Sequence, residues 1–99
     1  MIHRFWSGLV RRGAADKYIA HLRTAVFPDL EAIDGYRGGE VLRRATPRGV
    51  EFVVTTRWTS LDAIRKFAGE DHERAVVPPA ARALMVEFDE TVRHYEAVE

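Results

Sequence analysis

Two residues of this chain have the side chains needed for proton abstraction in a dry pocket, His94 and Arg4. His94 lies in the closing segment, residues 86–98, whose even positions are mostly apolar. We expect the first segment of the chain to run beside it, which brings Arg4 and Trp6 within reach. An imidazole has an ordinary pKa near ~6.5 and accepts protons at physiological pH, while a neighbouring guanidinium stabilises an anion. We therefore predict His94 as the base and Arg4 as the anion stabiliser of a catalytic site.

Both residues also have a purely structural interpretation. His94 is equally compatible with a hydrogen-bonded core or rim histidine close to the C-terminus. A buried arginine nearly always has a partner. Glu90 and Glu96 share the alternation of His94, so we expect one of them to form an ion pair with Arg4.

Aromatic side chains are candidates for the walls of a substrate pocket. Trp6 and Trp58 offer large flat surfaces for an aromatic ligand, although a tryptophan in a small core is often packing alone. Thr56 shares a strand face with Trp58, and Phe67 belongs to the apolar stripe of a helix. We predict that Trp6, Trp58, Thr56 and Phe67 bind the substrate.

The other histidines give no sign of a metal site. His3, His21 and His72 are scattered, and none has metal-ligand spacing to another. His21 falls off the apolar stripe of its helix, and His72 lies in a charged segment that is a candidate lid, where we expect a solvated side chain. We find no phosphate-binding glycine loop and no nucleophile elbow, so hydrolase and nucleotide-binding functions have no support.

Length and composition exclude several classes of protein. Ninety-nine residues fit one domain, residues 1–99, with a core of its own. Fifteen basic and fifteen acidic residues cancel, whereas nucleic-acid binders show a basic excess. The N-terminus has neither a signal peptide nor a spanning helix, so we expect no membrane partner. The absence of cysteine suits a reducing cytoplasm, where we expect the protein to act.

These candidates must be positioned by a small set of strands and helices. Alternating and helical apolar spacings predict strands over residues 2–10, 36–45, 50–58 and within 86–98, and helices over 15–26 and 61–68. Pro28 should end or kink the first helix, with one further turn at 29–33, and Ser60 is placed to cap the second. Residues 71–77 look like a further short helix that Pro78-Pro79 stops.

The order of these elements predicts a ferredoxin-like α+β fold, βαββαβ, with a four-stranded antiparallel sheet. Right-handed crossovers place the first and third strands in the centre and the last strand beside the first. Both helices then cover one face. The other face is bare and partly apolar, with Phe5, Leu9, Val53 and Thr55 among its residues, so we expect a second copy of the chain to cover it.

Three stretches of this sequence resemble the antibiotic-biosynthesis-monooxygenase family of dimeric α+β barrel proteins. They are residues 58–61 (WTSL), residues 67–71 (FAGED) followed by Ala75-Val76, and residues 92–96 (VRHYE). The resemblance implies a homodimer whose sheets pack face to face, with a pocket in each subunit between sheet and helices. Some members oxidise aromatic polyketide-like substrates with dioxygen and without flavin or metal, and others bind and degrade haem.

Several of the family's functional positions carry other residues here. In the polyketide-oxidising members, an asparagine, a tryptophan, a tyrosine and an arginine line the pocket. The tryptophan corresponds to Trp58, and the asparagine and tyrosine positions fall at Val54 and Ile64. In the haem degraders, an asparagine, a tryptophan and a histidine ligand fall at Trp6, Phe67 and Val77.

We therefore expect a monooxygenase that needs no cofactor and oxidises a small aromatic or polyketide-like metabolite with dioxygen. The alternative is a non-catalytic dimer that binds a small apolar ligand or serves as an interaction module, and a third option is a haem-binding member. A roomy pocket exposing His94 and Arg4 would favour catalysis. A cavity filled by Trp6, Trp58 and Phe67 would favour the non-catalytic alternative.

Overall fold

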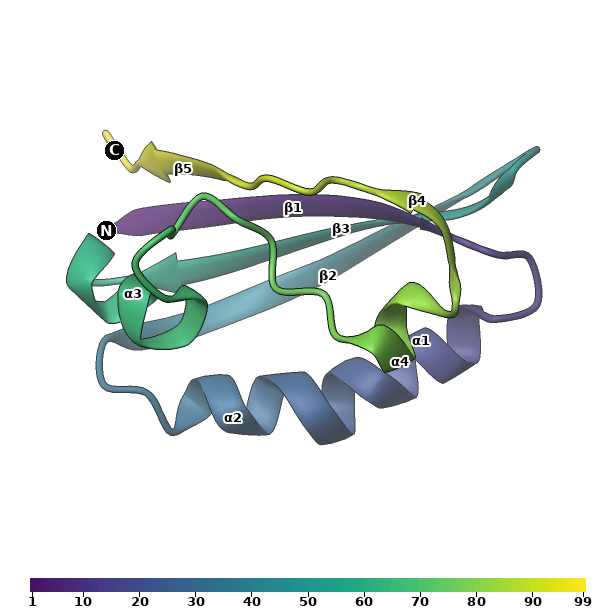
Figure 1. Cartoon of the computed structure of the whole chain (residues 1–99). Coiled ribbons are helices and arrows are strands. Elements are labelled where there is room, and N and C mark those ends of the chain that lie inside the picture. The colour runs from purple at the N-terminus through teal and green to yellow at the C-terminus, as the bar shows by residue number, and fades with distance from the viewer.

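An antiparallel sheet carries all the helices on one of its faces (Figure 1). The structure is a computed structural model that describes residues 1–99. The strands are β1 (Ile2–Val10), β2 (Tyr36–Thr46), β3 (Gly49–Trp58), β4 (Met85–Phe88) and β5 (Arg93–Glu96). They follow the order β2-β3-β1-β4, and β5 also pairs with β1. The predicted α+β ferredoxin-like fold and its central strands are confirmed.

The single closing strand predicted within residues 86–98 is two strands, β4 and β5, so the sheet has five strands instead of four. Phe88 pairs with Gly8 and Arg93 pairs with Phe5, both antiparallel to β1. At the break, the indole Nε1 of Trp6 donates to the carbonyl of Asp89 at 2.9 Å. The carbonyl of Asp89 lies outside the regular backbone ladder of the sheet, and this side-chain contact gives it a hydrogen bond.

One continuous helical stretch packs under the sheet, and its middle is wider than an α-helix (Figure 1). It consists of α1 (Ala15–His21), the π-helical segment η1 (Leu22–Val26) and α2 (Phe27–Glu31). In η1, the N–H of Phe27 donates to the carbonyl of Leu22, five residues earlier. Pro28 has no N–H to donate, and its ring would collide with a carbonyl one α-turn before it. The wider turns accommodate Pro28, and the helical stretch continues past it to Glu31.

Helix α3 (Leu61–Ala68) follows β3 directly, as its sequence signals predict. The side chain of Ser60 accepts a hydrogen bond from the N–H of Ala63 at 3.1 Å, and Gly69 ends the helix. The helix sits close to the turn before β2, where Gly35 has a φ of +100°. A Cβ on Gly35 would lie 2.5 Å from the Cβ of Ala63, so this approach requires glycine.

The predicted helix over residues 71–77 is wrong. This segment contains only turns and one isolated bridge, Arg74 to Thr91, and the helix α4 (Pro79–Arg82) begins where the prediction stops. Proline fits the first position of a helix because no partner for its N–H is needed there. None of the helices in the structure is long and apolar enough to cross a membrane.

The buried side chains form two clusters between sheet and helices. One contains Val10, Tyr18, Leu22 and Phe52, and the other contains Leu30, Trp58, Ala63 and Ile64. Val10, Phe52 and Trp58 are completely buried. These clusters hold the helices against one face of the sheet, and a space remains between the two clusters.

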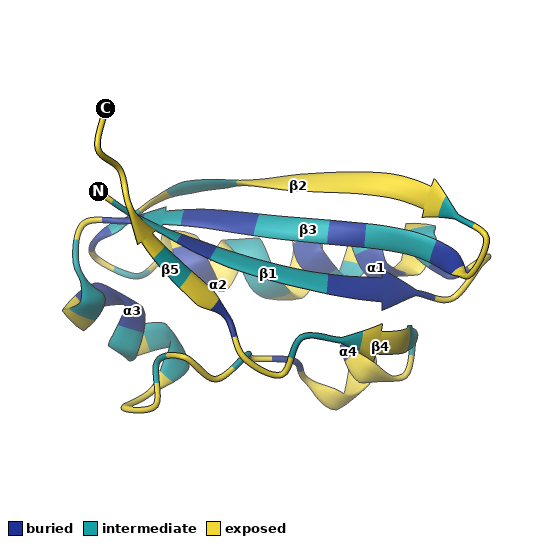
Figure 2. Ribbon diagram, turned by 90° about the horizontal axis from the view of Figure 1, so that it is seen from above, coloured by how far each residue is buried: buried dark blue, intermediate teal, exposed yellow.

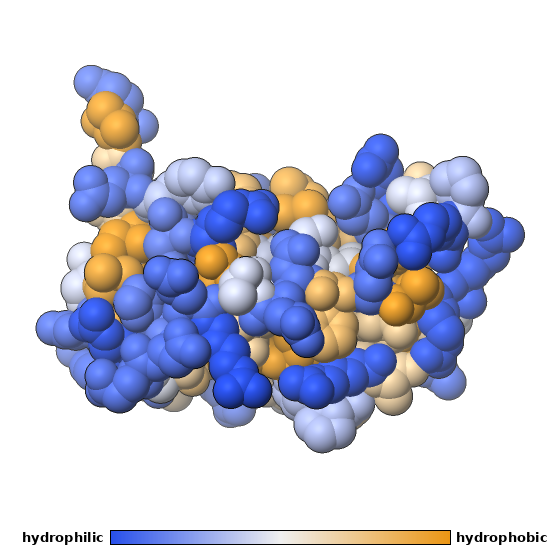
Figure 3. Space-filling model, turned by 45° about the horizontal axis from the view of Figure 1, so that its top comes forward, coloured by the Kyte–Doolittle hydropathy of each residue, from blue (hydrophilic) through white to orange (hydrophobic).

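The opposite face of the sheet has no helix over it, as predicted (Figure 2). We call it the open face and define it by Phe5, Leu42, Val53 and Tyr95. Leu42 is 55% exposed and Tyr95 is 51% exposed, and the ring of Tyr95 meets that of Phe5 edge-on at 5.4 Å. The space-filling view shows apolar side chains interspersed with charged ones on this side (Figure 3).

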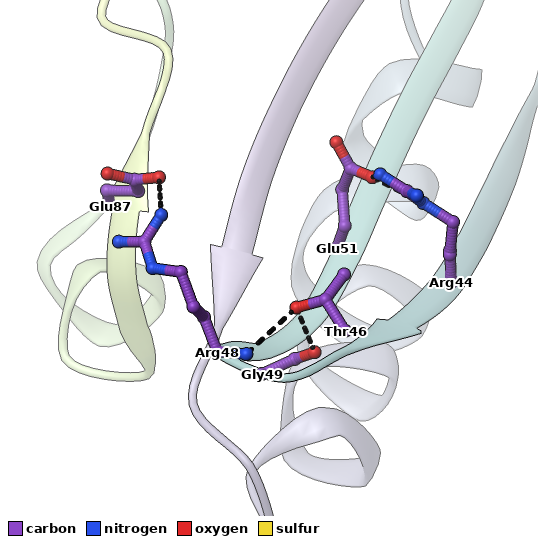
Figure 4. A network of polar contacts seen from close by, with 6 residues as sticks. All are labelled: Arg44, Thr46, Arg48, Gly49, Glu51 and Glu87. Carbon is purple, nitrogen blue, oxygen red and sulfur yellow. Dashed lines mark hydrogen bonds and ion pairs between the residues drawn. The ribbon is translucent and has the colours of Figure 1, made fainter.

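Charged side chains surround the hairpin turn at one end of the open face (Figure 4). Arg44 on β2 pairs with Glu51 on β3 at 2.6 Å, and Arg48 in the turn pairs with Glu87 on β4 at 2.9 Å. The hydroxyl of Thr46 donates to the carbonyl of Gly49 and accepts from the N–H of Arg48. Polar side-chain contacts therefore hold the hairpin turn, whereas the side chains along its two strands alternate between the two faces of the sheet.

Candidate functional site

A small, mostly apolar cavity lies between the sheet and the helices. It has a volume of about 70 Å³, and 12 of its 16 lining residues are hydrophobic. The others are Arg4, His21, Thr56 and Pro78. Ligand pockets commonly hold about 300–1,000 Å³, and a cavity of about 150 Å³ suffices for benzene. In this conformation the cavity has room for dioxygen but not for an aromatic ring.

Arg4 contributes the only permanent charge in this lining. It is 5% exposed on the central strand β1. Its Nη1 donates to the carbonyl of His72 at 2.6 Å, and its Nη2 donates to the carbonyl of Arg74 at 3.1 Å. The predicted ion pair with Glu90 or Glu96 is wrong, since none of the ion pairs in the structure includes Arg4. Backbone carbonyls compensate the buried guanidinium only in part, and its charge is not neutralised.

The surroundings of Arg4 favour a positive charge facing an apolar space. Burial lowers the pKa of Arg4 to about 10, which still leaves it protonated at neutral pH. Its guanidinium carbon lies 5.7 Å from the ring centre of Phe67, a cation–π distance. An anion brought into the cavity would meet this charge in a medium that screens it weakly.

His94 lies against Arg4 but is not among the residues that line the cavity. Its Nε2 is 3.0 Å from Arg4 Nη1, and since a guanidinium only donates, Nε2 must accept. Burial, then the charge of Arg4 and then His72 lower the pKa of His94 to about 4, against a weaker opposing effect of Glu73. At neutral pH the ring is therefore uncharged, with its Nε2 lone pair directed at Arg4.

Trp6 lines the cavity. Its ring lies over Gly8, two residues along the same face of β1, where a Cβ would approach an indole carbon to 2.4 Å. On the helix side the ring lies 6.3 Å from that of Tyr18. Gly8 and the bond from Trp6 to Asp89 thus fix the orientation of the indole.

The other three predicted substrate-binding residues fall in two groups. Thr56 and Phe67 line the cavity. Trp58 does not, because it is completely buried behind them. Its Nε1 donates to the hydroxyl of Thr56 at 2.8 Å, and its ring stacks on Phe67 at 6.1 Å. The structure therefore brings Arg4, Trp6, Thr56 and Phe67 together and places Trp58 as their support.

Residues 70–78, which we call the cover, close the cavity from the side. Val76, Val77 and Pro78 belong to the lining. Besides the two bonds from Arg4, backbone bonds join Ala75 to Glu90 at 2.8 Å and Val92 to Glu73 at 2.7 Å. The predicted solvated position of His72 is only partly right, because its half-buried ring lies 5.4 Å from that of His94.

His21 is the lining residue that the sequence prediction missed. Its Nε2 is buried and has no hydrogen-bond partner, and its ring stacks on Tyr18 at 6.3 Å. The prediction that His21 falls off the apolar stripe is wrong. The signal was its position three residues after Tyr18, which places both on one side of a helix.

No group of three or more histidine, cysteine, aspartate or glutamate side chains in the structure is arranged to hold a metal ion. The sequence matches the model of the antibiotic biosynthesis monooxygenase family over residues 1–79. No curated protein matches it.

Solved structures of similar fold include proteins of more than one activity. A crystal structure of an antibiotic biosynthesis monooxygenase covers 100% of both chains at 19% identity, with a TM-score of 0.72. The haem degrader MhuD from Mycobacterium tuberculosis, with two haems in its active site, covers 100% of this chain and 97% of its own at 19% identity and a TM-score of 0.68. The match to a crystal structure of a protein from Shewanella oneidensis covers 95% of this chain and 87% of that one, at 21% identity and with a TM-score of 0.71. At these identities the likeness shows the fold alone.

Proposed function

The chain belongs to the antibiotic biosynthesis monooxygenase family, and from this premise we propose that it is a cofactor-independent monooxygenase oxidising a small phenolic or enolic metabolite with dioxygen. The observation that carries the proposal is a buried cation, Arg4, in an apolar cavity with no carboxylate to neutralise it. Such a charge stabilises an anion that forms beside it. The substrate class is an aromatic or polyketide-like molecule that ionises in the cavity.

The reaction balances without an added reductant. For a substrate with an activated methylene group, the sum is R₂CH₂ + O₂ → R₂C=O + H₂O. Loss of a proton gives an electron-rich anion, which passes one electron to dioxygen. The two radicals combine to form the C–O bond of a peroxide, and elimination of water breaks its O–O bond. The substrate supplies all four electrons, so one oxygen atom enters the product and the other leaves as water.

Within this proposal Arg4 stabilises the anion, while Trp6 and Phe67 hold the ring. Thr56 adds a polar contact, and Trp58 positions Thr56 and Phe67 from behind. His94 suits a positioning role better than that of a base. Its pKa near 4 makes it a weak proton acceptor at neutral pH, and its Nε2 already accepts from Arg4.

Substrate entry requires the cover to move, because the present cavity of about 70 Å³ is too small for a ring. The cover has no helix or regular strand, and Arg4 holds two of its carbonyls. An incoming anion competes with these carbonyls for the guanidinium. Arg4 would then couple opening of the cover to binding of the substrate.

The test is dioxygen uptake with a panel of anthrones and quinols. We expect uptake with one ketone formed per dioxygen, and a loss of about 100-fold in kcat/KM for Arg4→Met, which corresponds to about 2.7 kcal/mol of transition-state stabilisation. Arg37→Met, an exposed arginine outside the cavity, is the matched control and should retain wild-type rates. Equal rates in wild type and Arg4→Met would contradict the proposal.

A second candidate is a non-catalytic protein that binds a small apolar ligand. The small volume of the cavity and its filling by Trp6 and Phe67 favour this alternative. Binding of the panel without any dioxygen uptake would support it.

Haem is a poor fit. The ligand position that the resemblance assigns falls at Val77, which has no donor atom, and a porphyrin far exceeds the closed cavity. We expect titration with haem to leave its Soret band unchanged.

We further propose that two copies pair through their open faces and that the pair acts in the cytoplasm. The exposed apolar side chains of the open face support pairing. The lack of cysteine suits a reducing compartment.

A further inference from the structure

His21 lines the cavity, and one nitrogen of its ring has no hydrogen-bond partner. Its Nε2 is buried without a hydrogen-bond partner, the only buried side-chain nitrogen or oxygen of the structure in that state. An unsatisfied buried polar atom costs about 1–3 kcal/mol. A ligand that pairs with Nε2 would recover that free energy.

The ring of His21 is held where such a ligand would find it. It stacks on Tyr18 with the two planes 23° apart. His21 ends α1, and η1 begins at the next residue, so the widened turn starts directly beneath this side chain. Tyr18 is a neutral neighbour, since burial raises its pKa above the ordinary value.

The two histidines near the cavity differ in what their Nε2 atoms can do. Nε2 of His94 accepts a bond from Arg4. Nε2 of His21 is free, and His21 shares the lining with Arg4, the cation that would stabilise an anion. Arg4 uses three of its five N–H donors in the bonds to His72, His94 and Arg74. The lining thus offers one proton acceptor and spare cationic donors.

We infer that, once the cover has opened, His21 accepts the acidic hydrogen of the ligand, and that the ligand is a conjugated ring with two oxygen substituents. One is a hydroxyl that donates to His21 Nε2, and the other accepts from Arg4. This inference rests on the proposed oxygenase function for its chemistry but not for its binding contact. Conjugation delocalises the charge, so Arg4 stabilises the anion without contacting the oxygen that loses its proton.

In the reaction, the O–H bond of the enol or phenol breaks and its proton moves to Nε2, which leaves the electron pair on the substrate. After the peroxide forms, the imidazolium returns the proton to the terminal peroxide oxygen. Elimination of water then removes the remaining hydrogen of the oxidised carbon. His21 ends the cycle neutral, and the overall sum is unchanged.

The binding test uses 4-hydroxyacetophenone and its methyl ether, 4-methoxyacetophenone, neither of which should be oxidised. We expect the wild type to bind the hydroxyl compound at least 10-fold more tightly, and the ¹⁵N resonance of His21 Nε2 to shift on binding. His21→Leu should lose this preference, and His21→Gln, which retains a hydrogen-bonding amide, should keep part of it. His3→Leu, on the opposite face of the sheet, is the matched control. A 10-fold change corresponds to about 1.4 kcal/mol.

The stability of His21→Leu supplies a readout independent of ligand. Because the substitution removes an unpaired buried nitrogen, we expect a melting temperature no lower than that of the wild type. An unchanged preference in a folded His21→Leu variant would overturn the inference.

Catalytic data separate this inference from the proposed function. With an oxidised substrate, His21→Gln should lower kcat about 100-fold. Dioxygen uptake that is equal in wild type and His21→Gln would overturn the inference and leave the oxygenase function standing. A hydroxyl preference lost in His21→Leu, without uptake by any protein, would leave the binding contact standing and remove the oxygenase function.

Discussion

The two faces of this sheet are built from the same strands but differ in how deeply their apolar side chains are buried. On the helix face, Phe52 and Trp58 are completely buried. On the open face, Leu42 and Tyr95 remain about half exposed. Both faces are partly apolar because alternate residues of each strand point in opposite directions, yet the chain has helices enough for only one. The larger buried side chains and the cavity therefore lie on the helix face, and the open face is the one through which we propose that two copies associate.

The largest effect should come from removing the core of the helix face. We expect Trp58→Ala to lower the free energy of unfolding by about 3–5 kcal/mol, because it leaves a void under Thr56 and Phe67. Leu42→Ala on the open face should cost less than about 1 kcal/mol in the separated chain. Urea unfolding of both variants at low concentration measures the difference. Equal losses would break the distinction between the faces.

For association, the larger effect should come from a substitution on the open face. Leu42→Asp places an unpaired carboxylate on the open face, and we expect it to raise the dissociation constant of the proposed dimer about 100-fold, or about 2.7 kcal/mol. Sedimentation equilibrium measures the constant. Lys17→Glu, an exposed change on α1, should have no effect. A wild type that sediments at 11.3 kDa at all working concentrations would contradict pairing.

The cover of the cavity should loosen when Arg4 is replaced. Arg4→Met removes two charge-assisted bonds to carbonyls of the cover, each worth about 1.5–3 kcal/mol. We expect the amides of Ala75 and Val92 to exchange with solvent about 10–100 times faster. Arg65→Met, which loses only an exposed pair with Asp62, is the control. Unchanged exchange at both amides would mean that Arg4 does not hold the cover.

A smaller effect should appear on acidification. The pKa of His94 falls from its ordinary 6.5 to about 4 in the folded chain, so the unfolded chain binds the proton more readily. The stability contributed by neutral His94 is present above pH 6.5, is lost as the pH falls toward 4, and stays lost below it. Burial of the ring is the largest cause of this lowered pKa; Arg4 and then His72 lower it further, and Glu73 opposes them.

His94→Gln isolates this contribution from the carboxylates that titrate in the same range. Between pH 6.5 and 4, we expect the wild type to lose on the order of 1 kcal/mol more than the variant, after a discount for solvent screening of a half-exposed ring. Denaturant unfolding at both pH values provides the comparison. Parallel losses would show that His94 titrates alike in both states.

The smallest effect should come from the ion pairs at the hairpin end of the open face. Arg48 and Glu87 are 62% and 60% exposed, and solvent screens such pairs strongly. We expect Arg48→Ala to leave the unfolding free energy of the separated chain unchanged within the error of denaturant unfolding. A larger loss that vanishes at high salt would indicate a stronger network than the exposure suggests.

The fold could be predicted from the sequence because its signals are local and agree with one another. Alternation defined the strands, the Ser60 cap and Gly69 bounded α3, and handedness gave the order of the sheet. The edge strand could not be predicted as two pieces, because its break depends on the indole of Trp6, which is 83 residues away from Asp89.

The site was predicted less completely, for a different reason. Alternation correctly placed Arg4, Trp6 and Thr56 on the helix face. Pairing in three dimensions decided the rest: Arg4 bonds to carbonyls of the cover instead of a glutamate, and His94 is occupied by Arg4. His21 was misplaced because a histidine was not counted with the apolar side chains of its helix, although it follows Tyr18 by three residues in α1.

The five residues of η1 also affect how this chain should be aligned with its relatives. A π turn accommodates one more residue than an α turn of the same length along the axis, so the helix has absorbed the equivalent of a single-residue insertion. Positions counted forward from Ala15 and backward from Glu31 therefore differ by one in register. Pairwise alignment with a relative whose helix is regular needs a gap between residues 22 and 26, and deleting one residue there should restore an ordinary helix.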